Sequence, residues 1–124
     1  MPPGIKQGGC KQRKIDIYKV PGAFELPGKV KRLTRGDTSY DAIITLGCVI
    51  KGETDHYHYI SQAVTDGIMS LTIELDSDYP KIIFGVLTCQ SKELAIARSG
   101  SNMDKNKGYE AGKAALKMIS TKKD

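Results

Sequence analysis

The chain of 124 residues has few cysteines and no long apolar run. These two features argue against a disulfide-rich protein, a cysteine metal site and a membrane-spanning protein. Cys10, Cys48 and Cys89 are an odd number of cysteines at spacings that match no metal motif, so neither a disulfide framework nor a metal site is expected. The last two lie in apolar segments, and we expect them to be buried, reduced thiols that act as small hydrophobic side chains. The longest apolar runs, 42–46 and 82–87, are far too short to span a membrane.

The sequence also lacks the features of secreted and nucleic-acid-binding proteins. No basic segment followed by an apolar one opens the chain, so we expect a cytoplasmic protein without membrane attachment. The net charge is +5, but the excess of basic residues lies at the two ends of the chain, without an aromatic stacking platform among them and without a recognised nucleic-acid module. No nucleic acid is therefore expected as a partner, whereas an anionic small molecule stays a candidate ligand.

What is present is the pattern of one α/β domain. Residues 1–14 are rich in Pro, Gly and Lys and are expected to be irregular, and residues 15–124 are long enough for a single domain. Strands are predicted where apolar residues alternate or follow one another, at 15–20, 40–50 and 81–88. Helices are predicted where apolar residues recur every three to four positions, at 24–33, 56–75, 91–97 and 109–120. Strands that alternate with helices indicate a mainly parallel sheet.

In such folds, ligands bind where parallel strands end and loops lead into helices. After the strand at 40–50, Gly52, Glu53 and Thr54 precede a helix, whose free amides and dipole favour an anion such as phosphate. The alternative is an ordinary helix start capped by Thr54 or Asp55. His56 lies in the first turn, and an imidazole exchanges protons near neutral pH, although a histidine at this position is more often a surface residue.

Three further polar residues could take part in binding. His58 lies two positions after His56 and points to another face of the helix, so the two histidines are a poor metal-binding pair. Arg98 and Lys107 flank a polar loop and suit phosphate as a guanidinium fork and a point charge. The alternative is that both are solvated charges on a loop. The residues by themselves indicate no reaction.

Five blocks of sequence resemble the lumazine synthase family, and they occur in the order and near the spacing found there. The blocks are VPGAFELP at 20–27, LGCVIKGETDHY at 46–57, IFGVLT at 83–88, ARSG at 97–100 and NKG at 106–108. The resemblance covers the chain from about residue 15 to its end. It implies a cofactor-independent transferase of riboflavin biosynthesis. That enzyme condenses 5-amino-6-(D-ribitylamino)uracil with 3,4-dihydroxy-2-butanone 4-phosphate to give 6,7-dimethyl-8-ribityllumazine, phosphate and water.

The resemblance also implies roles for individual residues. His56 would be the proton-transfer residue, and Phe84 would reach the pyrimidine from an adjacent subunit. The residues implied to bind the pyrimidine substrate are Ala23, Phe24, Glu25, Cys48, Val49, Ile50 and Phe84. The residues implied to bind the butanone phosphate are Glu53, Thr54, Arg98 and Lys107.

The fold implied is flavodoxin-like, a three-layer α/β/α sandwich with a mainly parallel four-stranded sheet. Family members begin with a strand that lies between the second and third strands and carries an aromatic residue, and here that strand is missing. Its loss would expose backbone groups on both neighbours, so another chain fills the gap, the sheet rearranges, or the sequence is incomplete.

The resemblance implies active sites shared between the subunits of a homo-oligomer. A pentamer and a sixty-subunit shell both stay open, because the loop at 99–108 is slightly longer than in shell-forming relatives. Riboflavin synthase is the partner enzyme implied. An alternative function is that of a weak or inactive oligomeric scaffold that binds flavins or pteridines. His58 replaces a residue that is usually acidic in the family.

Overall fold

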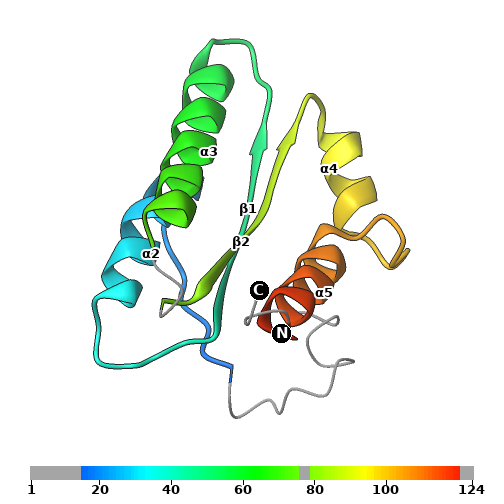
Figure 1. Ribbon diagram of the computed structural model, residues 1–124. Coiled ribbons are helices and arrows are strands. Elements are labelled where there is room, and N and C mark those ends of the chain that lie inside the picture. The colour runs from blue at the N-terminus through cyan, green and yellow to red at the C-terminus, as the bar shows by residue number, and fades with distance from the viewer. Residues whose placement is uncertain (1–14, 76–78, 121–124) are drawn as a thin grey trace.

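The computed structural model describes residues 15–75 and 79–120, which form a parallel pair of strands covered by helices (Figure 1). Strands β1 (Ala42–Ile50) and β2 (Lys81–Cys89) pair in parallel, from Ala42 opposite Lys81 to Ile50 opposite Cys89. The helices are the 3-10 helix η2 (Ala23–Glu25), α2 (Leu26–Thr34), α3 (His56–Glu74), α4 (Lys92–Ser99) and α5 (Lys107–Ser120). The strands predicted at 40–50 and 81–88 and the four predicted helices are thus confirmed, with no bound shifted by more than two residues.

The helices lie on both sides of the strand pair, α2 and α3 on one side and α4 and α5 on the other (Figure 1). On the first side, Val49 and Val86 of the strands pack against Val64 and Ile68 of α3. On the other side, Ile83 packs against Ala111 and Ala115 of α5. This arrangement confirms the α/β class and the parallel sheet. The sheet in the described residues has two strands, fewer than the four that the resemblance implies.

The approach of α2 to α3 depends on a glycine. A Cβ atom on Gly67 of α3 would lie 3.0 Å from the Cγ atom of Pro27 in α2, closer than nearly all such contacts in proteins. Pro27 is tolerated because it lies in the first turn of α2, where its missing N–H would have no helical acceptor. Within residues 15–75 and 79–120, no helix is both long enough and apolar enough to cross a membrane.

The strand predicted at 15–20 is wrong. These residues have no regular secondary structure, and Asp16, Ile17, Tyr18 and Lys19 are all exposed, so the alternation does not produce one buried face. The reason is that a strand exists only where a second backbone pairs with it, and none of the described residues pairs with this segment. The prediction that residues 1–14 are irregular falls outside the described residues, and so does Cys10.

Candidate functional site

The carboxyl ends of β1 and β2 lie side by side and place two helix starts at one edge of the sheet. The N–H of Lys51 donates to the carbonyl of Cys89 at 2.9 Å, which continues the strand pairing by one residue beyond β1. From this edge the chain enters α3 after β1 and α4 after β2 (Figure 1). Ser91 caps α4 by accepting a hydrogen bond from the N–H of Leu94 at 3.3 Å.

The start of α3 brings together three of the predicted site residues. Glu53, Thr54 and His56 are all exposed. The Thr54 hydroxyl oxygen accepts the N–H of His56 at 3.3 Å, whereas the Asp55 carboxylate forms no capping hydrogen bond. In the described part of the chain, the amides of Thr54 and Tyr57 have no acceptor. Two open amides beside the positive end of a 19-residue helix form a site that favours an anion.

The helix η2 is held against β1 by a second glycine. Gly47 leaves room for Ala23 and Leu26: a Cβ atom on Gly47 would lie 3.7 Å from the Ala23 Cβ atom and 3.3 Å from the Leu26 Cδ1 atom. Ala23 is therefore packed against the core beside the second half of β1. Phe24, next to it, is 58% exposed, and Glu25 is exposed as well. The turn thus presents an aromatic ring and a carboxylate to solvent.

The last residues of β1 point alternately into and out of the core. Val49 is buried, whereas Cys48 and Ile50 are exposed, so the expected burial of Cys48 is wrong, and that of Cys89 is confirmed. The error arises because Cys48 faces outward on a strand that is apolar on both faces. Partial burial raises the pKa of the Cys48 thiol, and the neighbouring Cys89 raises it further. Cys48 therefore carries a neutral thiol at physiological pH.

Phe84 lies away from the carboxyl edge within one subunit. It is opposite Thr45 on the ladder, four residues before the rung that joins Val49 to Thr88. At about 3.3 Å per residue, this places Phe84 roughly 13 Å along the strand from Val49. Its ring is half-buried and packs against the core cluster that contains Val64 of α3.

Arg98 and Lys107 are also not joined to the start of α3. Arg98 lies in the last turn of α4, which runs away from the carboxyl edge, and its side chain is exposed (Figure 1). Across the described residues, no hydrogen bond or ion pair links Arg98 to Glu53 or His56. The Lys107 Nζ atom instead lies 3.4 Å from the Glu110 Oε1 atom.

A comparison with protein families decides the assignment. The family model described as 6,7-dimethyl-8-ribityllumazine synthase matches residues 4–123, nearly the whole chain. The chain belongs to the lumazine synthase family. The resemblance carried by the five sequence blocks is thereby confirmed. Family membership indicates a role in riboflavin biosynthesis and a transferase activity.

In this lumazine synthase family member, Asn106 positions the loop between Arg98 and Lys107. Its Oδ1 atom accepts the N–H of Tyr109 at 2.9 Å and so caps α5, while its Nδ2 atom donates to the carbonyl of Gly100 at 2.7 Å. Sequence reasoning named no role for Asn106. The available signal was an asparagine directly before a helix, which is a preferred capping residue.

Proposed function

We propose that the chain catalyses the lumazine synthase reaction. It condenses 5-amino-6-(D-ribitylamino)uracil with 3,4-dihydroxy-2-butanone 4-phosphate to form 6,7-dimethyl-8-ribityllumazine, and it releases phosphate and water without a cofactor. The observation that carries the proposal is the start of α3. At the carboxyl edge of the sheet in this family member, the N-terminus of α3 favours an anion and lies next to the exposed imidazole of His56.

The phosphate of the four-carbon substrate is proposed to bind at Glu53 and Thr54. Open amides and the helix dipole stabilise the charge on the leaving phosphate, because their orientation is fixed before the substrate arrives. The Glu53 carboxylate is exposed and turns to solvent while its backbone faces the anion. Arg98 and Lys107 add positive charge from a neighbouring subunit, with Lys107 leaving its ion pair with Glu110.

His56 is proposed to move protons between the two substrates. The amine of the pyrimidine attacks the carbonyl carbon of the butanone, and loss of water from the adduct gives a Schiff base. Both the addition and the dehydration transfer protons, which an imidazole performs at neutral pH. The pyrimidine is held by Ala23, Phe24 and Glu25 of the η2 turn and by Cys48, Val49 and Ile50 of β1. Holding both substrates at one edge supplies much of the remaining acceleration.

We propose that the site is completed by a neighbouring copy in a cytoplasmic homopentamer. Phe84 and Arg98 are remote from His56 within one subunit, so they serve a site in the next subunit more readily than their own. Helix α3 also exposes large apolar side chains at helical spacing, with Tyr59 at 73% and Ile73 at 74% exposure. Light scattering tests the stoichiometry. A shell, or a complex with riboflavin synthase, would give a larger mass.

The reaction is tested by following the absorbance of the lumazine product with both substrates present. His56→Gln is expected to lower kcat by about 10²-fold or more, the range that general acid–base residues contribute. Arg98→Gln is expected to raise KM for the butanone phosphate. His58→Gln is the matched control on the same turn and should leave both constants unchanged. Equal rates for His56→Gln and the unchanged protein would remove the assigned role, and absence of turnover by the unchanged protein would remove the reaction.

A second candidate function is that of a scaffold that binds flavins or pteridines without turnover. It is favoured by the segment 15–20, which leads into the η2 turn without pairing to any described strand. Titration with riboflavin separates the two functions: tight binding without turnover supports the scaffold, and normal turnover excludes it.

A further inference from the structure

Arg98 and Lys107, the two cations proposed for the substrate phosphate, lie at the two ends of one loop. Arg98 is in the last turn of α4, Lys107 is the first residue of α5, and residues 100–106 connect the two helices (Figure 1). Both are long side chains that lose rotational freedom when they bind an anion. What the fold can fix beforehand is the backbone from which each side chain starts.

A single side chain of this loop bonds to both helix ends. The Asn106 Nδ2 atom donates to the carbonyl of Gly100, the residue directly after α4, at 2.7 Å. The Oδ1 atom of the same amide accepts the N–H of Tyr109, in the first turn of α5, at 2.9 Å. The donor half of the amide therefore holds the end of α4, and the acceptor half caps α5.

The side chain of Asn106 is enclosed by its own loop. Asn106 is half-buried, whereas the preceding Asp104 and Lys105 are exposed. Gly108 leaves room for the amide, because a Cβ atom at this glycine would lie 3.3 Å from the Asn106 Oδ1 atom, closer than most such contacts. The backbone N–H of Asn106 donates to the carbonyl of Met103 at 3.4 Å, which turns the loop back toward α5. These contacts hold the amide in the orientation in which both of its hydrogen bonds form.

The two cations differ in what fixes them. Lys107 directly follows the capping residue, and its Nζ atom lies 3.4 Å from the Glu110 Oε1 atom. Arg98 is exposed, and among the described residues no carboxylate forms an ion pair with it. The hydrogen bond from Asn106 to Gly100 joins the end of α4 that carries Arg98 to the start of α5. The position of Arg98 therefore depends on this bond more than the position of Lys107 does.

We propose that Asn106 is a positioning residue for the substrate phosphate, which acts by fixing the end of α4 and thereby the base of the Arg98 side chain. The inference rests on the proposed function, in which Arg98 binds that phosphate. Loss of the donor half of the amide should lower the affinity for phosphate, because the freed end of α4 must be ordered again when the anion binds. Proton transfer at His56 and contacts to the pyrimidine involve other elements, so neither should change.

The first test is Asn106→Ser, followed through the absorbance of the lumazine product. Serine is a preferred capping residue and keeps an acceptor for α5, but its side chain carries no amide donor and is too short to reach Gly100. The KM for the butanone phosphate should rise about three- to tenfold, the effect of one hydrogen bond. The KM for the pyrimidine and kcat should not change. An unchanged KM for the butanone phosphate, or an equal loss in kcat, would overturn the proposal.

Asn102→Ser is the matched control, because it makes the same chemical change in the same loop. The Asn102 Oδ1 atom accepts the N–H of Asp104 at 3.1 Å, a local turn contact that a serine hydroxyl can replace. This variant should have the KM values and the kcat of the unchanged protein. A rise in KM equal to that of Asn106→Ser would contradict the role assigned to Asn106.

Asn106→Asp is a second variant that keeps the fold if the shorter serine weakens it. Aspartate has the size of asparagine, keeps the Oδ1 acceptor for α5 and is itself a preferred cap, but it cannot donate to Gly100. Its KM for the butanone phosphate should rise at least as much as that of Asn106→Ser, since its charge also repels the phosphate. An unchanged KM in this variant would overturn the proposal.

A double-mutant cycle separates positioning of Arg98 from a general structural role. Asn106→Ser should raise KM no further in an Arg98→Gln background, because the side chain that it positions is already gone. In a Lys107→Gln background it should keep its full effect. A further rise of the same size in both backgrounds would overturn the proposal, because Asn106 would then act independently of Arg98.

Calorimetric titration with inorganic phosphate gives a readout that needs no turnover. Asn106→Ser should bind phosphate about three- to tenfold more weakly than the unchanged protein and the Asn102→Ser control. This result without turnover by the unchanged protein would keep the positioning role and remove the reaction. Turnover with equal KM and equal phosphate affinity in Asn106→Ser would remove the positioning role and keep the reaction. Neither turnover nor phosphate binding by the unchanged protein would remove both.

Discussion

Replacing Gly85 by alanine tests how closely the two strands and α5 approach one another. A Cβ atom at Gly85 would lie 2.7 Å from the carbonyl oxygen of Thr45 on β1, 2.8 Å from the Leu46 Cδ2 atom and 3.3 Å from the Ala111 Cβ atom on α5. The first of these atoms belongs to the backbone of a paired strand and cannot rotate away. The added methyl group must therefore push β1, β2 or α5 apart.

The magnitude follows from the kind of atom displaced. Forcing an extra methyl group into a well-packed core costs about 1–3 kcal/mol. Against this, exchange of glycine for alanine stabilises by about 0.4–1 kcal/mol where the backbone permits it, since the unfolded chain loses freedom. Because the contact is backbone and lies under 3.0 Å, we expect Gly85→Ala to lower the free energy of unfolding by about 2 kcal/mol.

The assay is urea unfolding followed by circular dichroism at matched protein concentration, so that association affects all variants equally. With a slope of about 2 kcal/mol per molar urea, the midpoint of Gly85→Ala should fall by roughly 1 M. Gly28→Ala is the matched control, because no atom lies within 4 Å of a Cβ at this position in α2. It should raise stability by about 0.5–1 kcal/mol.

Gly85→Ala should therefore lower the free energy of unfolding, whereas Gly28→Ala should raise it. A Gly85→Ala protein as stable as the unchanged chain would show that the strands and α5 are farther apart than described. A loss of stability in Gly28→Ala similar to that in Gly85→Ala would show that the effect comes from the backbone conformation of glycine and not from the contact with Thr45.

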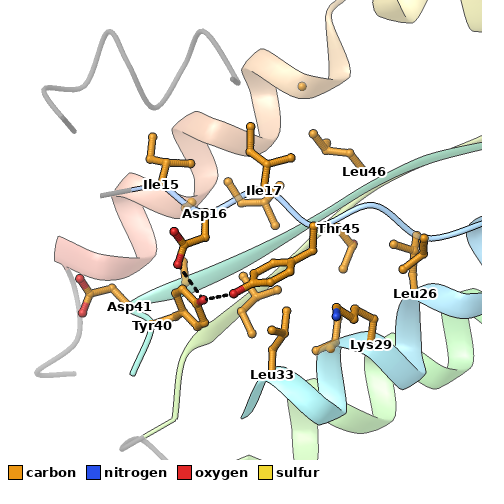
Figure 2. A pocket seen from close by; sticks show the side chains of 18 of the residues that line it. Ile15, Asp16, Ile17, Leu26, Lys29, Leu33, Tyr40, Asp41, Thr45 and Leu46 are labelled. Atoms are coloured by element: carbon orange, nitrogen blue, oxygen red, sulfur yellow. Dashed lines mark hydrogen bonds between the residues drawn. The ribbon is translucent and has the colours of Figure 1, made fainter. Parts of the chain in front are cut away.

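Three further perturbations test local features. The pKa of Tyr40 is raised above its ordinary value, mainly by the hydrogen bond with Tyr18 and secondly by the hydrogen bond with Asp16. The stability that these hydrogen bonds contribute is complete below about pH 10 and is lost as the pH rises further. Melting temperatures should therefore decline less above pH 10 for Tyr40→Phe than for the unchanged protein, and parallel declines would show that the hydrogen bonds of Tyr40 with Tyr18 and Asp16 (Figure 2) add no stability. Ser91→Ala should lower the free energy of unfolding by about 1 kcal/mol in urea, since α4 loses its cap; no change would mean that water replaces the hydroxyl. Cys48 should react with iodoacetamide at pH 7.5 more slowly than N-acetylcysteine, by peptide mass spectrometry, because burial and Cys89 raise its pKa; equal rates would refute this.

The residue pattern was enough to predict the structure of segments whose conformation depends mainly on their own residues. The helix α3 follows from apolar residues at helical spacing, and its predicted range 56–75 differs from His56–Glu74 by one residue. The capping role of Ser91 can likewise be inferred from its place directly before a helix, because its hydroxyl needs only the amides of the next turn. Parallel strands followed by helices also place loop 51–55 at the carboxyl edge without any knowledge of distant contacts.

Prediction from the residue pattern failed where the structure of one segment depends on contact with another segment of the chain. The alternation at 15–20 predicts a strand, but pairing requires a neighbouring backbone that the segment does not encode. The exposure of Cys48 depends on which face of β1 the helices cover. The positions of Phe84 and Arg98 relative to His56 depend on how far the chain travels between them, which local spacing does not reveal.

The parallel pairing of β1 and β2 has a consequence for synthesis of the chain. Ala42 pairs with Lys81 and Ile50 with Cys89, so every rung joins residues 39 positions apart. No part of the ladder can form until the whole of α3 has been made and folded back. At about 5–20 residues per second, an emerging apolar β1 waits roughly 2–8 s for its partner. During that interval it is the segment of the nascent chain that a chaperone for exposed apolar strands would bind.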